Sequence, residues 1–195
     1  MSDALSKAIS FEYSEETGID VAAGPAGARH VWLWLTKQPK RMGEFHTWLA
    51  ERGVAWPSNL WMGTSVMSSK TKWRADRLAE AGKGDAGVRR FLSVEPQDEE
   101  VRMTPQIAKV DWVIQGSESR SQAAGFDLAW ARLLRDQCRD KKVPYFLKQL
   151  GEHPVAGGKP VELVDRHGGA WHEWPEDLRV REVPDFAATP TACSG

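Results

Sequence analysis

The chain has 195 residues, which is enough for one domain with a substantial core and short for two. Hydrophobic residues make up 41% and charged residues 27%, the balance of a soluble globular protein, which argues against a disordered chain. No apolar run approaches the length of a membrane helix. The net charge of −1 gives no global basic field to attract nucleic acid, so a nucleic-acid partner has no support from charge.

Residues 1–29 form a weakly patterned leader without the basic-then-apolar layout of a secretion signal. Within it, AISFEY is a possible edge strand ahead of a flexible Gly- and Ala-rich stretch. From residue 31, VWLWL shows no alternation, which predicts a strand buried on both faces, as in parallel sheets covered by helices. PKRMGEFHTWLAERG then has the apolar spacing of a helix, with Gly53 as its stop.

Four further apolar runs predict strands: NLWMGTSV, RRFLSVEP, VDWVIQGSE and VPYFLKQ. A helix is predicted over 69–82, and Asp127 is placed to cap another before the last strand. The strand starts at 31, 60, 90, 111 and 143 are mostly about 30 residues apart, the length of a βαβ unit. We therefore predict an α/β fold over residues 30–152, a partial (β/α) barrel of about five parallel strands with flanking helices.

The rest of the sequence predicts an extension of this barrel. Residues 153–184 are expected to form a small C-terminal hairpin that turns at Gly168-Gly169, followed by a wrapping segment. Residues 185–195 are small and polar, which predicts a disordered tail. Two cysteines, Cys138 and Cys193, provide no disulfide framework and fit a reducing cytoplasm.

Polar residues follow each predicted strand, where the carboxyl ends of parallel strands form the usual ligand site. Gly116 in QGSES allows backbone amides to approach a ligand closely. The alternative is internal pairing, in which a lysine of this rim neutralises Glu95 or Glu118. The candidate acid–base residues are Lys37, Glu95 and Lys148, and the candidate ligand-binding residues are Gly116, Ser117, Glu118, Ser93, Thr64 and Ser65.

Three other sequence features, a glycine-rich segment, a pair of histidines and a cysteine, do not indicate a functional site when their neighbours in the sequence are considered. GKGDAG, residues 82–87, follows a predicted helix and precedes a strand, so it indicates a helix stop and turn and not a dinucleotide loop. His167 and His172 flank a turn without further ligands at metal spacing, so no metal site is predicted. Cys138 lies on the apolar face of its helix and is expected to be a core residue.

One series of motifs, in order, is WLWLTKQPKRM, PSNLWMGTSV, RFLSVEP, DWVIQGSES, WARLLRDQC, VPYFLKQLGE and WHEWPEDLRVRE. The series resembles the uncharacterised phage and prophage proteins of the gp thirty-seven/sixty-eight family, over about residues 30–184. That family looks like a divergent radical-SAM group akin to spore photoproduct lyase. The resemblance implies a partial (β/α) barrel, a phage or prophage gene, and a place in the cytoplasm of the bacterial host cell.

Members of that group typically carry three cysteines after the first strand, which hold an iron–sulfur cluster that cleaves S-adenosylmethionine. This sequence has no cysteine before Val31 and two in all, so this chain alone cannot supply such a cluster. Where relatives have Gly-Gly-Glu-Ser, Gly116 is kept, Ser117 replaces the second glycine, and Glu118 and Ser119 remain. The resemblance therefore leaves S-adenosylmethionine as a possible ligand.

Three functions are open at this point. The first is a non-catalytic binding or protein-interaction protein. The second is half of a split radical-SAM-like enzyme, with nucleic-acid modification as one candidate activity, completed by a separate cysteine-bearing chain. The third is a different enzyme that uses Lys37, Glu95, Glu118 or Lys148 as acid or base. In all three, the strand at 31–35 would be an apolar sheet edge that the leader, a second copy or another protein must cover.

Overall fold

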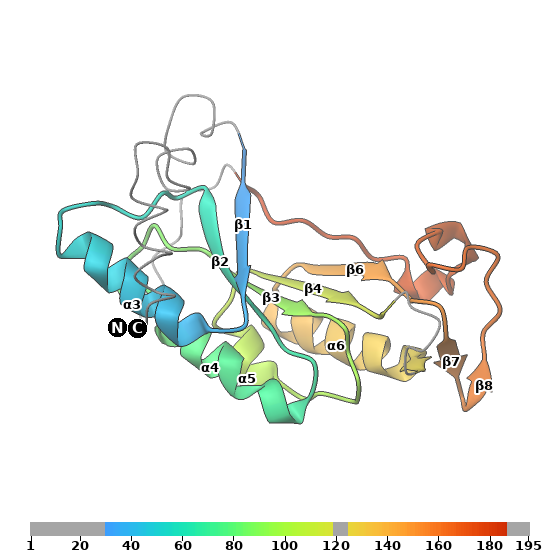
Figure 1. Ribbon diagram of the computed structural model, residues 1–195. Helices are drawn as coiled ribbons and strands as arrows, with labels where there is room; N and C mark the ends of the chain where they lie inside the picture. The colour runs from blue at the N-terminus through green and yellow to red at the C-terminus, as the bar shows by residue number, and fades with distance from the viewer. Residues whose placement is uncertain (1–29, 119–124, 187–195) are drawn as a thin grey trace.

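The computed structural model describes residues 30–118 and 125–186, and its centre is a five-stranded, all-parallel sheet (Figure 1). The strands lie in the order β1-β2-β3-β4-β6, so neighbours in space are also successive in the chain. This confirms the predicted α/β fold. The predicted leader and most of the predicted tail lie outside the described residues. The strands are β1 (Trp32–Thr36), β2 (Leu60–Ser65), β3 (Arg90–Val94), β4 (Trp112–Gly116) and β6 (Tyr145–Gln149).

All four α-helices of the described residues lie together on one side of this sheet (Figure 1). Each new strand is added on the same side of the previous one, so right-handed crossovers bring every helix to the same face. The opposite face, which we call the open face, has no helix over it in the described residues. The helices are α3 (Pro39–Ala50), α4 (Trp73–Glu80), α5 (Thr104–Ile107) and α6 (Leu128–Lys141), and a short 3-10 turn, η2 (Ser69–Thr71), precedes α4.

The main core lies between the sheet and these helices. Alternate strand residues face it, and Met62, Leu92 and Val113 are completely buried there. At the β1 end, the ring of Trp34 stacks on that of Trp56 with centroids 5.8 Å apart. Burial of each large apolar side chain contributes about 1.5–3 kcal/mol, so this side of the sheet supplies most of the hydrophobic stabilisation.

Local sequence signals set the helix ends. Pro39 occupies the first turn of α3, where its missing N–H costs nothing. The carboxylate of Asp127 accepts a hydrogen bond from the backbone N–H of Ala129 at 2.9 Å, which confirms the predicted cap of α6. Gly82 and Gly84, with φ of 62° and 88°, form the turn between α4 and β3. The GKGDAG segment is therefore the helix stop that its context predicted.

The C-terminal extension contains a hairpin, but at a different place from the one predicted. β7 (Pro154–Ala156) and β8 (Lys159–Pro160) turn at Gly157-Gly158, and β5 (Phe126–Asp127) completes this small sheet. The prediction of a turn at Gly168-Gly169 is wrong. Those glycines lie in an irregular loop, followed by the 3-10 turns η3 (Trp171–Glu173) and η4 (Glu176–Leu178).

The segment after η4 covers the outer edge of β6. The backbone N–H of Leu147 donates to the carbonyl of Val180, and that of Glu182 donates to the carbonyl of Tyr145, both at 2.9 Å. Arg181 donates to the Lys148 carbonyl at 3.0 Å, and its guanidinium lies 5.1 Å from the centre of the Trp174 ring. At this end of the sheet, β6 therefore gains an antiparallel partner from its own chain.

Candidate functional site

Three polar side chains meet at the carboxyl ends of β3, β4 and β6. The ammonium of Lys148 lies 2.9 Å from a carboxylate oxygen of Glu95. The hydroxyl of Ser93 donates to the other carboxylate oxygen at 3.2 Å. A Cβ atom added to Gly116 would stand 3.0 Å from Glu95, so the glycine makes room for this carboxylate. The structure thus brings together four residues that the sequence placed on one rim, and it shows the internal pairing of a rim lysine with Glu95 that was the alternative interpretation.

Ser65 lies beside this group on β2. Its register partner on β3 is Ser93, and parallel register partners direct their side chains to the same face. Ser65 is 4% exposed, and its hydroxyl has no hydrogen-bond partner among the described residues. A buried polar group without a partner costs about 1–3 kcal/mol. Such a hydroxyl is typical of a position that a ligand or a water molecule completes.

We call Ser65, Ser93, Glu95, Gly116 and Lys148 the rim site. It borders an aromatic cluster on the open face, toward the amino ends of the strands. The ring of Phe91 lies directly over Gly63, where any side chain would collide with it. Trp61, Phe91 and Trp112 are buried in this cluster, Ile114 and Phe146 are half-buried at its border, and the ring of Phe186 packs on that of Trp61 with centroids 5.4 Å apart.

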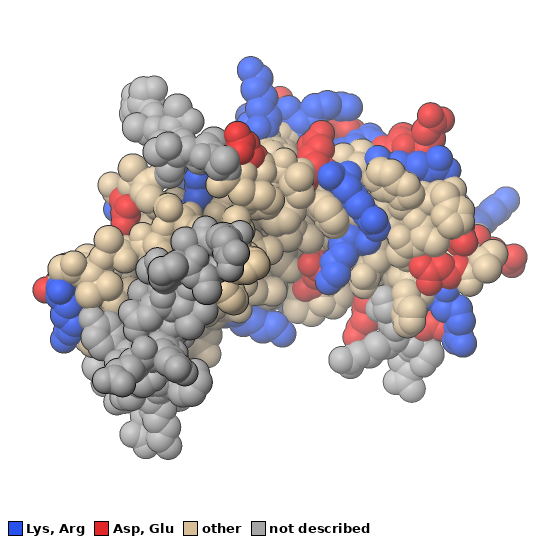
Figure 2. All heavy atoms as spheres, turned by 90° about the horizontal axis from the view of Figure 1, so that it is seen from above, with Lys and Arg blue, Asp and Glu red and all other residues tan. Residues whose placement is uncertain are grey.

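Figure 2 views the molecule from above the orientation of Figure 1, the side away from the helices. Neutral side chains make up a broad area of this face, and side chains of both charges are interspersed around it. No extended patch of one sign is visible there. A ligand of the open face would therefore meet few charged groups, among them those of the rim site, beside the half-buried Ile114 and Phe146.

Other candidates from the sequence lie nearby in different roles. The hydroxyl of Thr64 donates to the backbone carbonyl of Thr36 at 2.7 Å and joins the ends of β2 and β1. Ser117 is buried against Gly151, so its place is in the packing of the β4 and β6 ends. Lys37 follows β1, is exposed, and has no ion pair within the described part of the chain.

Glu118 lies near a second carboxylate, that of Asp98. Although Asp98 is an exposed residue, local desolvation, followed by the charges of Glu118 and Glu99, raises the pKa of its carboxyl. The backbone carbonyl of Glu118 accepts a hydrogen bond from the N–H of Glu152 at 3.4 Å. The ion pair of the rim therefore joins Lys148 to Glu95, and Glu118 instead increases the negative charge on the neighbouring loop.

A series of hydrogen-bonded, buried side chains lies beneath the rim site, and the sequence did not predict it. The Tyr145 hydroxyl donates to the side-chain carbonyl of Gln115, whose amide donates to Gln97, which in turn donates to the Glu99 carbonyl at 2.7 Å. Burial raises the pKa of Tyr145 well above its ordinary value, so the phenol stays a donor. Of these residues, Gln115 is one of the polar residues at the end of the predicted strand VDWVIQGSE.

Cys138, the cysteine within the described residues, is not placed to bind an iron–sulfur cluster. Cys138 is buried in α6, where burial, with a smaller effect of Glu182, raises the pKa of its thiol to about 12. Cluster ligation requires accessible thiolates. Within residues 30–118 and 125–186, no group of three or more His, Cys, Asp and Glu side chains is placed to hold a metal ion.

A family model described as a protein of unknown function, DUF5131, matches residues 1–176. The chain belongs to this family. Comparison with curated proteins and with solved structures finds no match. Among the helices that the structure describes, none combines the length and the apolar character needed to cross a membrane.

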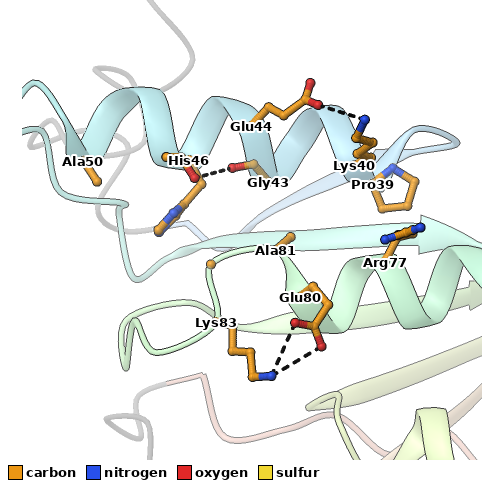
Figure 3. A pocket seen from close by; sticks show the side chains of 12 residues that line it. Pro39, Lys40, Gly43, Glu44, His46, Ala50, Arg77, Glu80, Ala81 and Lys83 are labelled. Carbon is orange, nitrogen blue, oxygen red and sulfur yellow. Dashed lines mark hydrogen bonds and ion pairs between the residues drawn. The ribbon is translucent and has the colours of Figure 1, made fainter.

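This DUF5131 chain also has a groove on its helical side, between α3 and α4, with a volume of about 440 Å³ (Figure 3). Four of its charged side chains form two exposed ion pairs: Lys40 lies 3.5 Å from Glu44, and Lys83 lies 3.3 Å from Glu80. Arg77 also lines the groove, without an ion pair among the described residues. His46 points across the groove, 2.9 Å from Asp85 outside it. None of the buried polar atoms that lack a partner in the described residues belongs to a residue of this groove, whereas the rim site contains Ser65, so the rim site is the better candidate.

Proposed function

We propose that this DUF5131 protein is a binding protein whose ligand occupies the rim site and the adjoining part of the open face, beside the half-buried Ile114 and Phe146. One observation carries the proposal. The buried hydroxyl of Ser65 has no partner in the described residues, although it lies next to a cluster of polar groups at the carboxyl ends of the strands. A sheet that buries a hydroxyl at this cost is consistent with a site that a ligand completes.

The chemistry of the rim site suggests the class of ligand. Lys148 suits a carboxylate, Glu95 suits an ammonium group, and the half-buried Ile114 and Phe146 offer apolar contacts for a ring. Gly116 leaves room for close approach to the Glu95 carboxylate. S-adenosylmethionine has an amino-acid head and an aromatic base, so it fits this donor set and agrees with the resemblance to radical-SAM-like barrels.

Radical chemistry by this chain alone is not part of the proposal. The sequence contains two cysteines, and Cys138 is a core residue whose thiol has a pKa of about 12. We propose that the chain is a phage-type relative of radical-SAM-like barrels that retains the binding rim and uses it without an iron–sulfur cluster of its own.

A calorimetric titration with S-adenosylmethionine tests the proposal. We expect saturable binding to the unmodified protein and a loss of more than about tenfold in affinity in Glu95→Gln, because one charged hydrogen bond is removed. Glu118→Ala tests the Gly116–Glu118 segment in the same way. Glu44→Gln, an exposed carboxylate of α3, is the matched control and should bind normally. No binding at millimolar ligand, or equal binding by all variants, would contradict the proposal.

The second candidate function is the split enzyme, which the position of β1 at one end of the sheet favours. A separate chain with the cysteine-bearing strands would continue the barrel from there. Copurification of such a chain, followed by cluster reconstitution in the complex, tests this candidate. An acid–base enzyme has less support, because Lys148 and Glu95 form an ion pair with each other. The interspersed charges likewise give no specific support to a nucleic-acid substrate.

A further inference from the structure

The two edges of the parallel sheet differ in how the described chain covers them. β6 is paired with residues 180–182, whereas β1 ends the sheet at the other side. On β1, the side chains of Leu33 and Leu35 are 43% and 49% exposed. Charged residues, prolines and bulges usually prevent edge-to-edge pairing of strands. β1 contains no charged residue and no proline, and its register with β2 is regular.

The backbone of β1 also directs hydrogen-bonding groups outward. Trp32 donates its N–H to the Asn59 carbonyl, on the β2 side. In a parallel pair, alternate residues bond to the same neighbour, so Trp34 and Thr36 share this direction. Leu33 and Leu35 therefore direct their N–H and C=O groups away from β2. The two residues with exposed apolar side chains are the same two that can pair with another strand.

We infer that β1 pairs with β1 of a second copy of this chain, in antiparallel orientation, with Trp34 on the twofold axis. In this register, Leu33 of each copy stands opposite Leu35 of the other, and both are hydrogen-bonded pairs. All four leucines then lie on the open face, where they form one apolar cluster across the axis. The two parallel sheets join into one continuous sheet.

Self-complementarity is the reason for choosing a second copy as the partner. A twofold interface requires a surface that matches itself, and this register pairs leucine with leucine. The nearest charge, on Lys37, stands opposite the apolar Val31 of the partner copy, so no like charges are opposed. A register shifted by two residues toward the carboxyl end would instead place Lys37 opposite Leu33. The rim site belongs to β2, β3, β4 and β6, so the dimer and the proposed ligand can be tested separately.

Analytical ultracentrifugation of the full chain over a range of concentrations tests the inference. We expect a species near twice the 21.8 kDa chain mass. Leu35→Lys should weaken it by more than about tenfold, because a lysine charge would lie against the leucine of the other copy. Val164→Lys replaces an exposed aliphatic residue elsewhere and should remain dimeric. A monomer at every concentration, or a dimer that Leu35→Lys leaves intact, would overturn the inference.

Cross-linking tests the register itself. In a background of Cys193→Ser, the Leu33→Cys and Leu35→Cys proteins are prepared separately and then mixed and oxidised. We expect a disulfide-linked dimer in the mixture and little in either protein alone, because residue 33 faces residue 35 and not its own copy. Equal cross-linking in all three samples would refute the register. Protection of β1 amides from hydrogen exchange in a monomer would show that the chain covers its own edge and would also refute the dimer.

Discussion

Removal of the Lys148 charge tests whether its ion pair with Glu95 serves a ligand or the fold. The two charged atoms are 2.9 Å apart, but the side chains are 53% and 20% exposed. Exposed ion pairs contribute about 0.2–1 kcal/mol, because water screens the charges and the lysine loses rotamer freedom. Glu95 keeps its hydrogen bond from Ser93 in the variant. We therefore expect Lys148→Met to lower the free energy of unfolding by about 1 kcal/mol or less.

Urea denaturation followed by circular dichroism measures this difference. For a domain of this size, a loss of 1 kcal/mol lowers Tm by about 2–4 °C. Lys40→Met, which removes the exposed pair with Glu44, is the matched control and should change stability by a similar amount. A loss above about 3 kcal/mol in Lys148→Met is the signature of a broken buried pair. That result would show that the pair is structural and would refute its assignment to a ligand site.

Three further outcomes follow from the same structure. Tyr145→Phe leaves the buried Gln115 carbonyl without its hydroxyl donor and should lower the free energy of unfolding by about 1–3 kcal/mol in urea titrations. Because desolvation and the nearby Glu118 raise the pKa of Asp98, its charged form is disfavoured in the folded state. Asp98→Asn should therefore raise Tm at neutral pH. This increase in Tm should vanish below about pH 3.9, where the carboxyl is protonated in the folded and the unfolded state. Thermal denaturation at a series of pH values measures the difference. With Cys193 replaced by serine, Cys138 should react with an aromatic disulfide reagent only after the protein unfolds, because its thiol is buried and has a pKa of about 12. Rapid labelling of the native protein would contradict this.

The parallel sheet could be predicted from the sequence because buried parallel strands need continuous apolar runs. VWLWL predicted a strand over 31–35, and β1 spans Trp32–Thr36. The prediction that this strand is buried on both faces is wrong: Leu33 and Leu35 are 43% and 49% exposed, because no helix of the described residues covers the open face. The polar residue that ends each run marks the point where the strand leaves the core. For this reason the sequence also indicated the rim, including Ser65 and Ser93.

The position of the C-terminal hairpin could not be predicted in the same way. Gly157-Gly158 and Gly168-Gly169 carry the same local turn signal. Tertiary contacts distinguish them: the Asp165 carboxylate accepts the N–H groups of Gly169 and Ala170 at 2.7 and 2.8 Å, and Gly168 packs against the backbone of Gly151. A carboxylate that organises a loop over several residues leaves no periodic pattern in the sequence.

The sequence also did not determine which lysine of the rim pairs with which carboxylate. Two lysines and two carboxylates allowed several pairings, and the choice depends on which face of the sheet each side chain meets. Lys148 shares the open face with Phe146, two residues earlier on β6, and there it reaches Glu95. Glu118 follows β4 on a loop beside Asp98. Strand alternation contains this information, but only once the register of the four strands is known.

The covered edge of β6 strengthens the case for a partner at β1. Residues 180–182 bond to β6 through two backbone hydrogen bonds, and Arg181 secures them through its bonds to the Leu147 and Lys148 carbonyls. The β1 edge can pair with other chains and aggregate, just as the β6 edge could if residues 180–182 did not cover it. There, Leu33 and Leu35 combine exposed side chains with outward backbone groups. An edge of this kind persists in a folded protein when another strand pairs with it, and an antiparallel second copy provides that strand in matching register.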